Sequence, residues 1–179
     1  MRIAAVSGSL RKVSSNTKLL QAAAALAAEG MEIQLFEGIG ELPHFNPDLD
    51  GDEPPASVIE WRKSLQEADG VILCTPEYAN GVPGVLKNAL DWIVSSGEFL
   101  DKPTAIISAS PLATGGKVAH ASLVLTLQMM TAKLFDGGQL SIPLIYKKLN
   151  EQGEFTDEAT VEEIKALLQA LAKAVKSRG

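Results

Sequence analysis

Five short apolar runs alternate with five longer helical segments, and this alternation constrains the fold more than any other feature of the chain. The apolar runs cover residues 3–6, 31–36, 70–75, 103–108 and 139–145, and the helical segments cover 18–28, 57–68, 85–95, 117–133 and 158–176. Strands that alternate with helices usually pair in parallel through right-handed crossovers. We therefore predict one α/β domain over residues 1–179, a doubly wound five-stranded parallel sheet with helices on both faces. The common strand order for such a sheet is 2-1-3-4-5.

Composition narrows the class of protein further. No run approaches the roughly eighteen apolar residues of a membrane-spanning helix, so no membrane span is expected. A strand that begins almost at once leaves no room for a signal peptide, and none is expected. Cys74 is the only cysteine, which excludes internal disulfides and fits a reducing, cytoplasmic compartment. His44 and His120 stand far apart without a second ligand at a recognisable spacing, so no metal site is predicted.

The loop after the first predicted strand has the composition of a phosphate site. It carries a cation and several small polar side chains directly before a helix: Ser9, Arg11, Ser15, Asn16 and Thr17. A helix N-terminus adds unpaired backbone N–H groups and a positive dipole end. Residues 1–28 hold four basic residues and no acid, although the whole chain has a net charge of -6. Such a local basic island favours a small anion over a nucleic acid. The alternative is that these polar residues only cap the helix.

Two further loops of unusual composition follow the third and fourth predicted strands. Residues 76–84 combine prolines and glycines with Tyr78 and Asn80, and residues 109–116 end in Gly115-Gly116. In the order 2-1-3-4-5, strands 1, 3 and 4 are neighbours, so the loops after them should meet in one crevice. Three such loops on one rim indicate a nucleotide-like ligand. The long segment 37–55, rich in Gly, Pro and Asp, is a candidate lid or rim of that crevice.

The motifs Gly8-Ser9-Leu10-Arg11 with Ser15-Asn16, Thr75-Pro76-Glu77-Tyr78, and residues 82–92 resemble the NAD(P)H-dependent FMN reductase family. The resemblance spans essentially the whole chain and implies a flavodoxin-like fold that binds FMN. It also implies that Ser9, Arg11, Ser15, Asn16 and Thr17 hold the phosphate. The residues that it places beside the isoalloxazine are Pro76, Glu77, Tyr78, Ala79, Asn80, Gly81, Ser110, Thr114, Gly115 and Gly116. Many members have asparagine directly after the tyrosine, where this chain has Ala79.

The resemblance also implies the activity. The expected reaction is ping-pong transfer of electron pairs from NAD(P)H, through FMN, to a quinone or a similar small acceptor such as a flavin, an azo dye or chromate. No side chain stands out as an obligate acid or base, so no catalytic residue is assigned. We expect a homodimer or a dimer of dimers, because the family dimerises beside the flavin and because the helix 85–95 is apolar over a wide arc. Its large apolar residues are Leu86, Leu90, Trp92 and Ile93.

Two alternatives from other classes stay open at this stage. One is a flavodoxin-type electron carrier without its own NAD(P)H turnover, although such carriers are usually more acidic around the flavin than this first loop. The other is a dinucleotide-binding enzyme with Glu37 as its ribose ligand, although the Gly-x-Gly-x-x-Gly fingerprint is absent. The sequence names neither the physiological acceptor nor the preferred nucleotide, NADH or NADPH.

Overall fold

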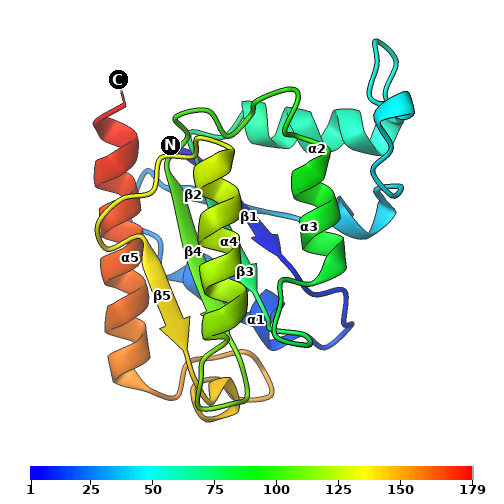
Figure 1. Ribbon diagram of the computed structural model, residues 1–179. Helices are drawn as coiled ribbons and strands as arrows, with labels where there is room; N and C mark the ends of the chain where they lie inside the picture. Colours follow the sequence, from blue (N-terminus) through cyan, green and yellow to red (C-terminus); the bar gives the residue numbers. More distant parts are fainter. Residues whose placement is uncertain (179) are drawn as a thin grey trace.

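The computed structural model describes residues 1–178 and contains a five-stranded, all-parallel sheet in the order β2-β1-β3-β4-β5 (Figure 1). The predicted strand order is therefore confirmed. The strands are β1 (Arg2–Ser7), β2 (Glu32–Phe36), β3 (Gly70–Thr75), β4 (Thr104–Ala109) and β5 (Gln139–Ile142). Every residue of β3 and β4 is buried, as expected of central strands covered on both faces.

Five helices cover the sheet, and alternate strand residues divide the core into two clusters. The helices are α1 (Ser15–Ala25), α2 (Ala56–Gln66), α3 (Gly84–Asp91), α4 (Lys117–Met129) and α5 (Glu158–Lys176). In β1, Ile3 and Ala5 pack with α1 and α5, whereas Ala4 and Val6 pack with α2, α3 and α4. This alternation follows from the two-residue period of a strand. Within residues 1–178, none of the helices is long and apolar enough to cross a membrane.

Several element ends differ from the predicted ones for local reasons. The last strand ends at Ile142 rather than at residue 145, because Pro143 follows and Leu144 takes a left-handed conformation at φ 51°. The predicted helix 117–133 ends at Met129, shortly before Thr131 at φ 57°. Helix α1 begins at Ser15 instead of residue 18. The predicted phosphate loop therefore contributes its last three residues to the first turn of a helix.

The segment 37–55 is a rim fastened to the helices beside it. It contains two short 3-10 helices, Gly38–Glu41 and Pro47–Leu49. The carbonyl of Pro43 accepts hydrogen bonds from Asn88 Nδ2 at 3.0 Å and from Trp92 Nε1 at 2.8 Å. Further along, Asp50 forms a 2.6 Å ion pair with Arg62 of α2. Of the two predicted roles for this segment, these attachments favour a fixed rim over a lid.

Candidate functional site

The loops after β1, β3 and β4 meet at the carboxyl end of the sheet, toward which the strand arrows point in Figure 1. Ser9 Oγ lies 3.4 Å from the hydroxyl of Tyr78, which joins the first loop to the second. Asn16 Nδ2 donates to the carbonyl of Ala109 at 3.4 Å, which joins α1 to the end of β4. The carboxylate of Glu77 bonds to the start of α4. These contacts hold the three loops together at one edge of the sheet, as the strand order predicts.

Hydroxyl groups cluster at the N-terminus of α1. Thr17 Oγ1 donates to Ser7 Oγ at 2.9 Å, and the backbone N–H of Ser9 also approaches Ser7 Oγ, at 3.4 Å. Ser14 is the N-cap of α1 and accepts from the N–H of Thr17. The first turn of α1 contains no acidic residue, and the side chain of Arg11 is exposed beside it. Hydrogen-bond donors, a helix dipole and an exposed guanidinium together suit an oxyanion.

A hollow of about 260 Å³ adjoins this hydroxyl cluster. Its polar and charged lining is Ser7, Ser9, Arg11, Lys12 and Thr17, together with the exposed Glu37. Ser7 and Lys12 are absent from the predicted site. Ser7 could have been included from its position in the sequence. It ends a buried strand directly before Gly8-Ser9, and the last residue of such a strand lies at the carboxyl edge of the sheet.

Asn16 serves the framework of the site through its side chain. It is 5% exposed, its Oδ1 accepts from Cys74 Sγ at 3.1 Å, and its Nδ2 holds the end of β4. Burial also raises the pKa of the Cys74 thiol, so this cysteine stays protonated and acts as a small buried residue rather than a nucleophile. The neighbouring Ser15 is partly exposed at the first position of the helix.

The second loop carries a two-residue hairpin. Tyr78 and Gly81 exchange both backbone hydrogen bonds, at 3.1 and 3.0 Å. The central residues Ala79 and Asn80 have φ values of 49° and 55°, the geometry of a type I′ turn. Tyr78, Ala79 and Asn80 are exposed, and Pro76 is buried at the base of the loop. The two hydrogen bonds and the buried Pro76 make this loop rigid.

Ala79 makes this hairpin strained, since alanine is disfavoured in the left-handed region by roughly 1–2 kcal/mol. Replacement by glycine or asparagine, which enter that region more readily, should raise the free energy of unfolding by about 0.5–1 kcal/mol. Ala79→Val should lower it, because a β-branched side chain fits the region still less well. Thermal unfolding of the three variants measures the order. Equal stability of Ala79→Asn and Ala79→Val would contradict the strain.

The third loop turns into α4 through two left-handed glycines. Gly115 and Gly116 have φ values of 64° and 76°. A Cβ on Gly116 would lie 3.4 Å from the Ser108 side chain and 3.6 Å from that of Glu77, so the loop packs closely against the second loop. Ser110 is buried and its Oγ accepts from the N–H of Leu112 at 3.1 Å. Thr114, by contrast, is exposed.

Comparison with known proteins decides the family. The sequence profile of the NADPH-dependent FMN reductase family matches residues 1–147. The chain belongs to this family. It is 40% identical over 163 residues to a quinone reductase of Pseudomonas putida strain KT2440, covering 84% of this chain and 85% of the relative. It is 36% identical to an Arabidopsis thaliana NADPH:quinone oxidoreductase, covering 96% and 90%. The solved structure of FerB, a flavoenzyme NAD(P)H:(acceptor) oxidoreductase of Paracoccus denitrificans, superposes with a TM-score of 0.88 at 32% identity, covering 98% and 97%.

This FMN reductase is therefore an oxidoreductase that uses FMN and NAD(P)H, with the flavodoxin-like fold. The dinucleotide-binding alternative is overturned, and Glu37 is an exposed residue directly after β2. The residues present fit FMN. The basic, hydroxyl-rich end of α1 suits its phosphate, and the hairpin with its exposed backbone suits the edge of a planar ring. When bound, FMN supplies the hydride and electron chemistry, while the protein binds and orients it.

A polar network lies beside the site, between α4 and the last two strands. His120 Nδ1 is 3.1 Å from Ser108 Oγ, which is 2.9 Å from Ser141 Oγ. His120 Nε2 is 3.2 Å from Gln139 Oε1. Burial holds the pKa of His120 below its usual range, so the imidazole is neutral at pH 7. The network anchors α4 to the sheet. Because His120 is neutral, it does not form an ion pair with an anionic ligand.

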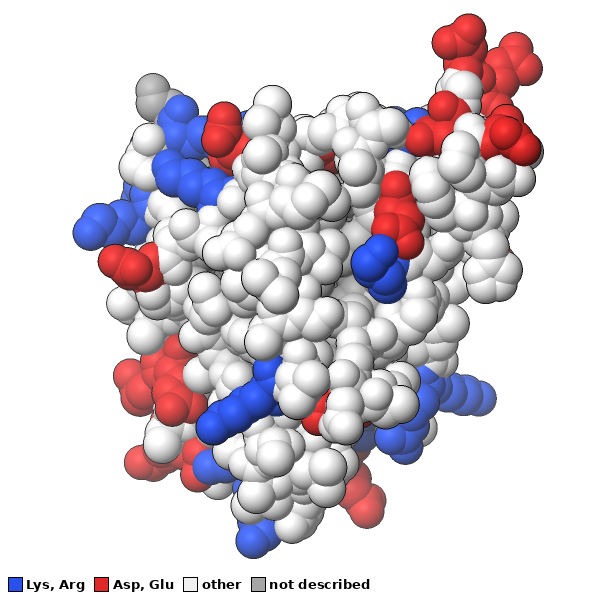
Figure 2. All heavy atoms as spheres, in the orientation of Figure 1, with Lys and Arg blue, Asp and Glu red and all other residues white. Residues whose placement is uncertain are grey.

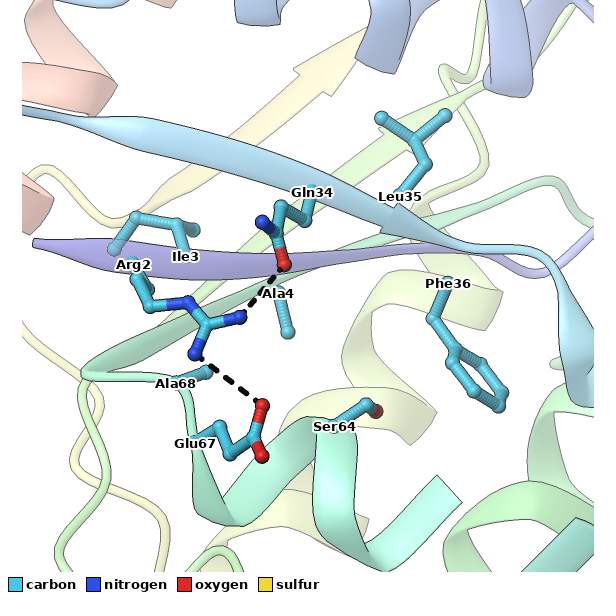
Figure 3. Close-up of a pocket in the computed structure, with 9 residues that line it drawn as sticks. All are labelled: Arg2, Ile3, Ala4, Gln34, Leu35, Phe36, Ser64, Glu67 and Ala68. Atoms are coloured by element: carbon cyan, nitrogen blue, oxygen red, sulfur yellow. Dashed lines mark hydrogen bonds and ion pairs between the residues drawn. The ribbon is translucent and has the colours of Figure 1, made fainter. Parts of the chain in front are cut away.

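A separate cleft of about 160 Å³ lies between β1, β2 and α2 (Figure 3). The guanidinium of Arg2 lies in it and is engaged by Glu67 at 3.2 Å and by Gln34 at 3.2 Å. This cleft is not a candidate flavin site, because it is small and because Arg2 is already paired. Among residues 1–178, no group of three or more His, Cys, Asp or Glu side chains could hold a metal ion.

Proposed function

We propose that this FMN reductase passes electrons in pairs from NAD(P)H to a quinone, in a ping-pong cycle. The observation that carries the proposal is the hairpin at residues 78–81, which is closed by two backbone hydrogen bonds and whose Tyr78 lines a hollow together with Gly8 and Arg11 of the first loop. One-electron flavin carriers rely partly on a loop that can flip a peptide toward the flavin. The two bonds fix the ends of the hairpin, and a flip of its central peptide would give a type II′ turn, which takes glycine at the position of Ala79. The relatives named as quinone reductases support the choice of acceptor.

Steady-state kinetics test this proposal. NADPH oxidation should depend on added benzoquinone, and double-reciprocal plots at several quinone concentrations should be parallel, as expected when the nucleotide leaves before the acceptor binds. Intersecting plots would contradict the ping-pong order. Absence of quinone-dependent turnover by the FMN-loaded protein would contradict the activity.

Reductive titration tests the delivery of electron pairs. With dithionite added slowly, the FMN-loaded protein should pass from the oxidised to the fully reduced spectrum through constant isosbestic points, because the closed hairpin and the nearby cations Arg11 and Lys12 favour the anionic, fully reduced ring. A large, long-lived third spectrum at the midpoint would contradict this and favour the electron-carrier alternative.

We also propose that the enzyme is a homodimer that associates through α4. From Val118 to Met129 this helix contains no charged residue, and Val118, Leu125 and Met129 are 51%, 68% and 61% exposed. In Figure 2, few charged side chains lie over α4. An exposed apolar helix face is typical of an interface, and a second copy with two-fold symmetry is the commonest occupant. The large apolar residues of the predicted helix 85–95 do not support the dimer, because all four belong to the core: Leu86 and Leu90 of α3, and Trp92 and Ile93 directly after it.

Leu125→Asp should convert the dimer into a monomer, because it places a charge in the centre of the apolar face. Analytical ultracentrifugation at micromolar concentration measures the change. Ile59→Asp is the matched control, since Ile59 is 52% exposed on α2, and it should leave the dimer intact. A monomeric wild-type protein with FMN bound would contradict the proposal.

We place the enzyme in the cytoplasm. The support is that its single thiol, Cys74, is buried and protonated and forms no disulfide. Fractionation of the producing cells with an antibody against the chain tests this location, and recovery outside the cytosolic fraction would contradict it.

A further inference from the structure

Glu77 caps a helix that lies 40 residues further along the chain. Its Oε2 accepts hydrogen bonds from the backbone N–H groups of Val118 and Ala119, at 2.8 and 2.9 Å. These are the second and third residues of α4, whose N-terminal N–H groups lack intrahelical partners. The residue at the N-cap position is Gly116, which has no side chain to do this. The cap of α4 therefore comes from the loop after β3.

Because Glu77 adjoins the hairpin, the cap also connects the hairpin to α4. Glu77 directly precedes Tyr78, the first residue of the hairpin. Its charged carboxylate at the positive end of a 13-residue helix is held more firmly than a neutral acceptor would be. Gly116 lies beside Glu77, since a Cβ on Gly116 would be in ordinary van der Waals contact with Glu77 Cβ, at 3.6 Å. The hairpin is thus tied to α4, an element anchored on β4 and β5.

We propose that Glu77 is a positioning residue for the flavin ring. It holds the hairpin at residues 78–81 at a fixed distance from α4, so that the hairpin backbone is in place before the isoalloxazine binds. Its side chain acts through the helix cap and not by contact with the flavin. The proposal rests on the assignment of the hairpin to the ring end of the FMN site.

Comparing the binding of two ligands distinguishes positioning of the ring from binding of the phosphate. FMN and riboflavin share the ring, and only FMN has the phosphate. A residue that positions the ring-binding hairpin should affect both ligands by the same factor, whereas Arg11 should affect FMN alone. Loss of the cap in Glu77→Ala should raise both dissociation constants about fivefold, the ratio that corresponds to a helix cap of usual size. Glu77→Gln keeps an acceptor without the charge, and about a threefold rise is expected.

Asp157→Ala separates ring positioning from general stability. Asp157 is the N-cap residue of α5, and its carboxylate accepts from the N–H of Thr160 at 2.9 Å and pairs with Lys148 at 2.8 Å. It lies outside the three loops of the site. This variant should lower the melting temperature of the apoprotein as Glu77→Ala does, and leave both dissociation constants unchanged.

The experiment measures the quenching of flavin fluorescence by apoprotein of the wild type and the variants, with the melting temperature of each. Parallel weakening of both ligands by the Glu77 variants alone supports the proposal. Wild-type affinity for both ligands in Glu77→Gln and Glu77→Ala overturns it, as does weakening of FMN alone. If Glu77→Ala does not fold, Glu77→Gln decides between these outcomes. A wild-type protein that binds neither flavin would instead overturn the FMN site itself.

Discussion

Arg11→Ala should weaken FMN binding by tenfold or more and leave riboflavin binding nearly unchanged. Arg11 is an exposed cation at the N-terminus of α1, beside the hydroxyl groups of Ser7, Ser9 and Thr17. A hydrogen bond to a charged group contributes about 1.5–3 kcal/mol. At 1.4 kcal/mol for each factor of ten, this predicts a loss of roughly ten- to a hundredfold. Because riboflavin lacks the phosphate, its dissociation constant should stay nearly unchanged.

Fluorescence titration of the apoprotein with each flavin measures this difference. Arg62→Ala is unsuitable as a control because it breaks a buried ion pair, whereas Lys165→Ala removes an exposed cation from α5, away from the three loops. The Lys165 variant should bind both flavins as the wild type does. Equal FMN affinity in Arg11→Ala and the wild type would contradict the assignment of the phosphate to this loop.

Asp50→Asn should lower the free energy of unfolding by roughly 2–4 kcal/mol at pH 7, because it leaves a largely buried guanidinium without its counter-charge. The side chains of Arg62 and Asp50 are 14% and 9% exposed, and Arg62 Nη2 also donates to the carbonyl of Trp92 at 2.7 Å. Arg62 Nε is buried without a hydrogen-bond partner among the described residues, so the guanidinium depends on the contacts of its Nη2. Ser95 Oγ donates to the other carboxylate oxygen of Asp50 at 2.6 Å.

The loss should depend on pH in a defined direction. Hydrogen bonds from Ser95 and Arg62 hold the pKa of Asp50 below its usual range. A carboxyl whose pKa is lowered in the folded state contributes stability that is fully present above its unfolded pKa, about 3.9, and that is lost as the pH falls through the folded value. The difference between wild type and Asp50→Asn should therefore be constant from pH 7 to about pH 5 and shrink below about pH 4.

Chemical denaturation at several pH values measures both effects. Glu162→Gln is the control for an exposed pair: Lys165 and Glu162 lie 2.8 Å apart with side chains 43% and 71% exposed, and such pairs contribute at most about 1 kcal/mol. A loss for Asp50→Asn no larger than that of Glu162→Gln would contradict the role of this pair in fastening the rim.

The strand order and the convergence of the loops could be predicted because they follow from features close together in sequence. The alternation of apolar runs with helical segments gives the parallel sheet, and the sheet places the loops after strands 1, 3 and 4 together. The second core cluster also follows from local patterning, since α5 repeats its apolar residues at helical spacing: Ile164, Leu167, Leu168 and Leu171.

What escaped prediction depends on contacts between distant residues. Asn16 is predicted to be a phosphate-binding residue, and only the fold shows that its amide bonds to Cys74 and Ala109, which lie 58 and 93 residues away. Glu77 belongs to a predicted flavin loop, and only the fold brings α4 to its carboxylate. The rim at 37–55 lacks periodicity because its order comes from partners on α2 and α3. Side-chain orientation of this kind is decided by tertiary packing, which a single sequence does not display.

The absorbance spectrum of the purified chain under anaerobic conditions tests the central claim most directly. The protein should be yellow or become yellow on addition of FMN, lose its visible flavin absorbance when one equivalent of NAD(P)H is added, and regain it when benzoquinone follows. A colourless protein that fails to bind added FMN, or a bound flavin that neither NADH nor NADPH reduces, would contradict the assignment of this chain as an FMN-dependent NAD(P)H oxidoreductase.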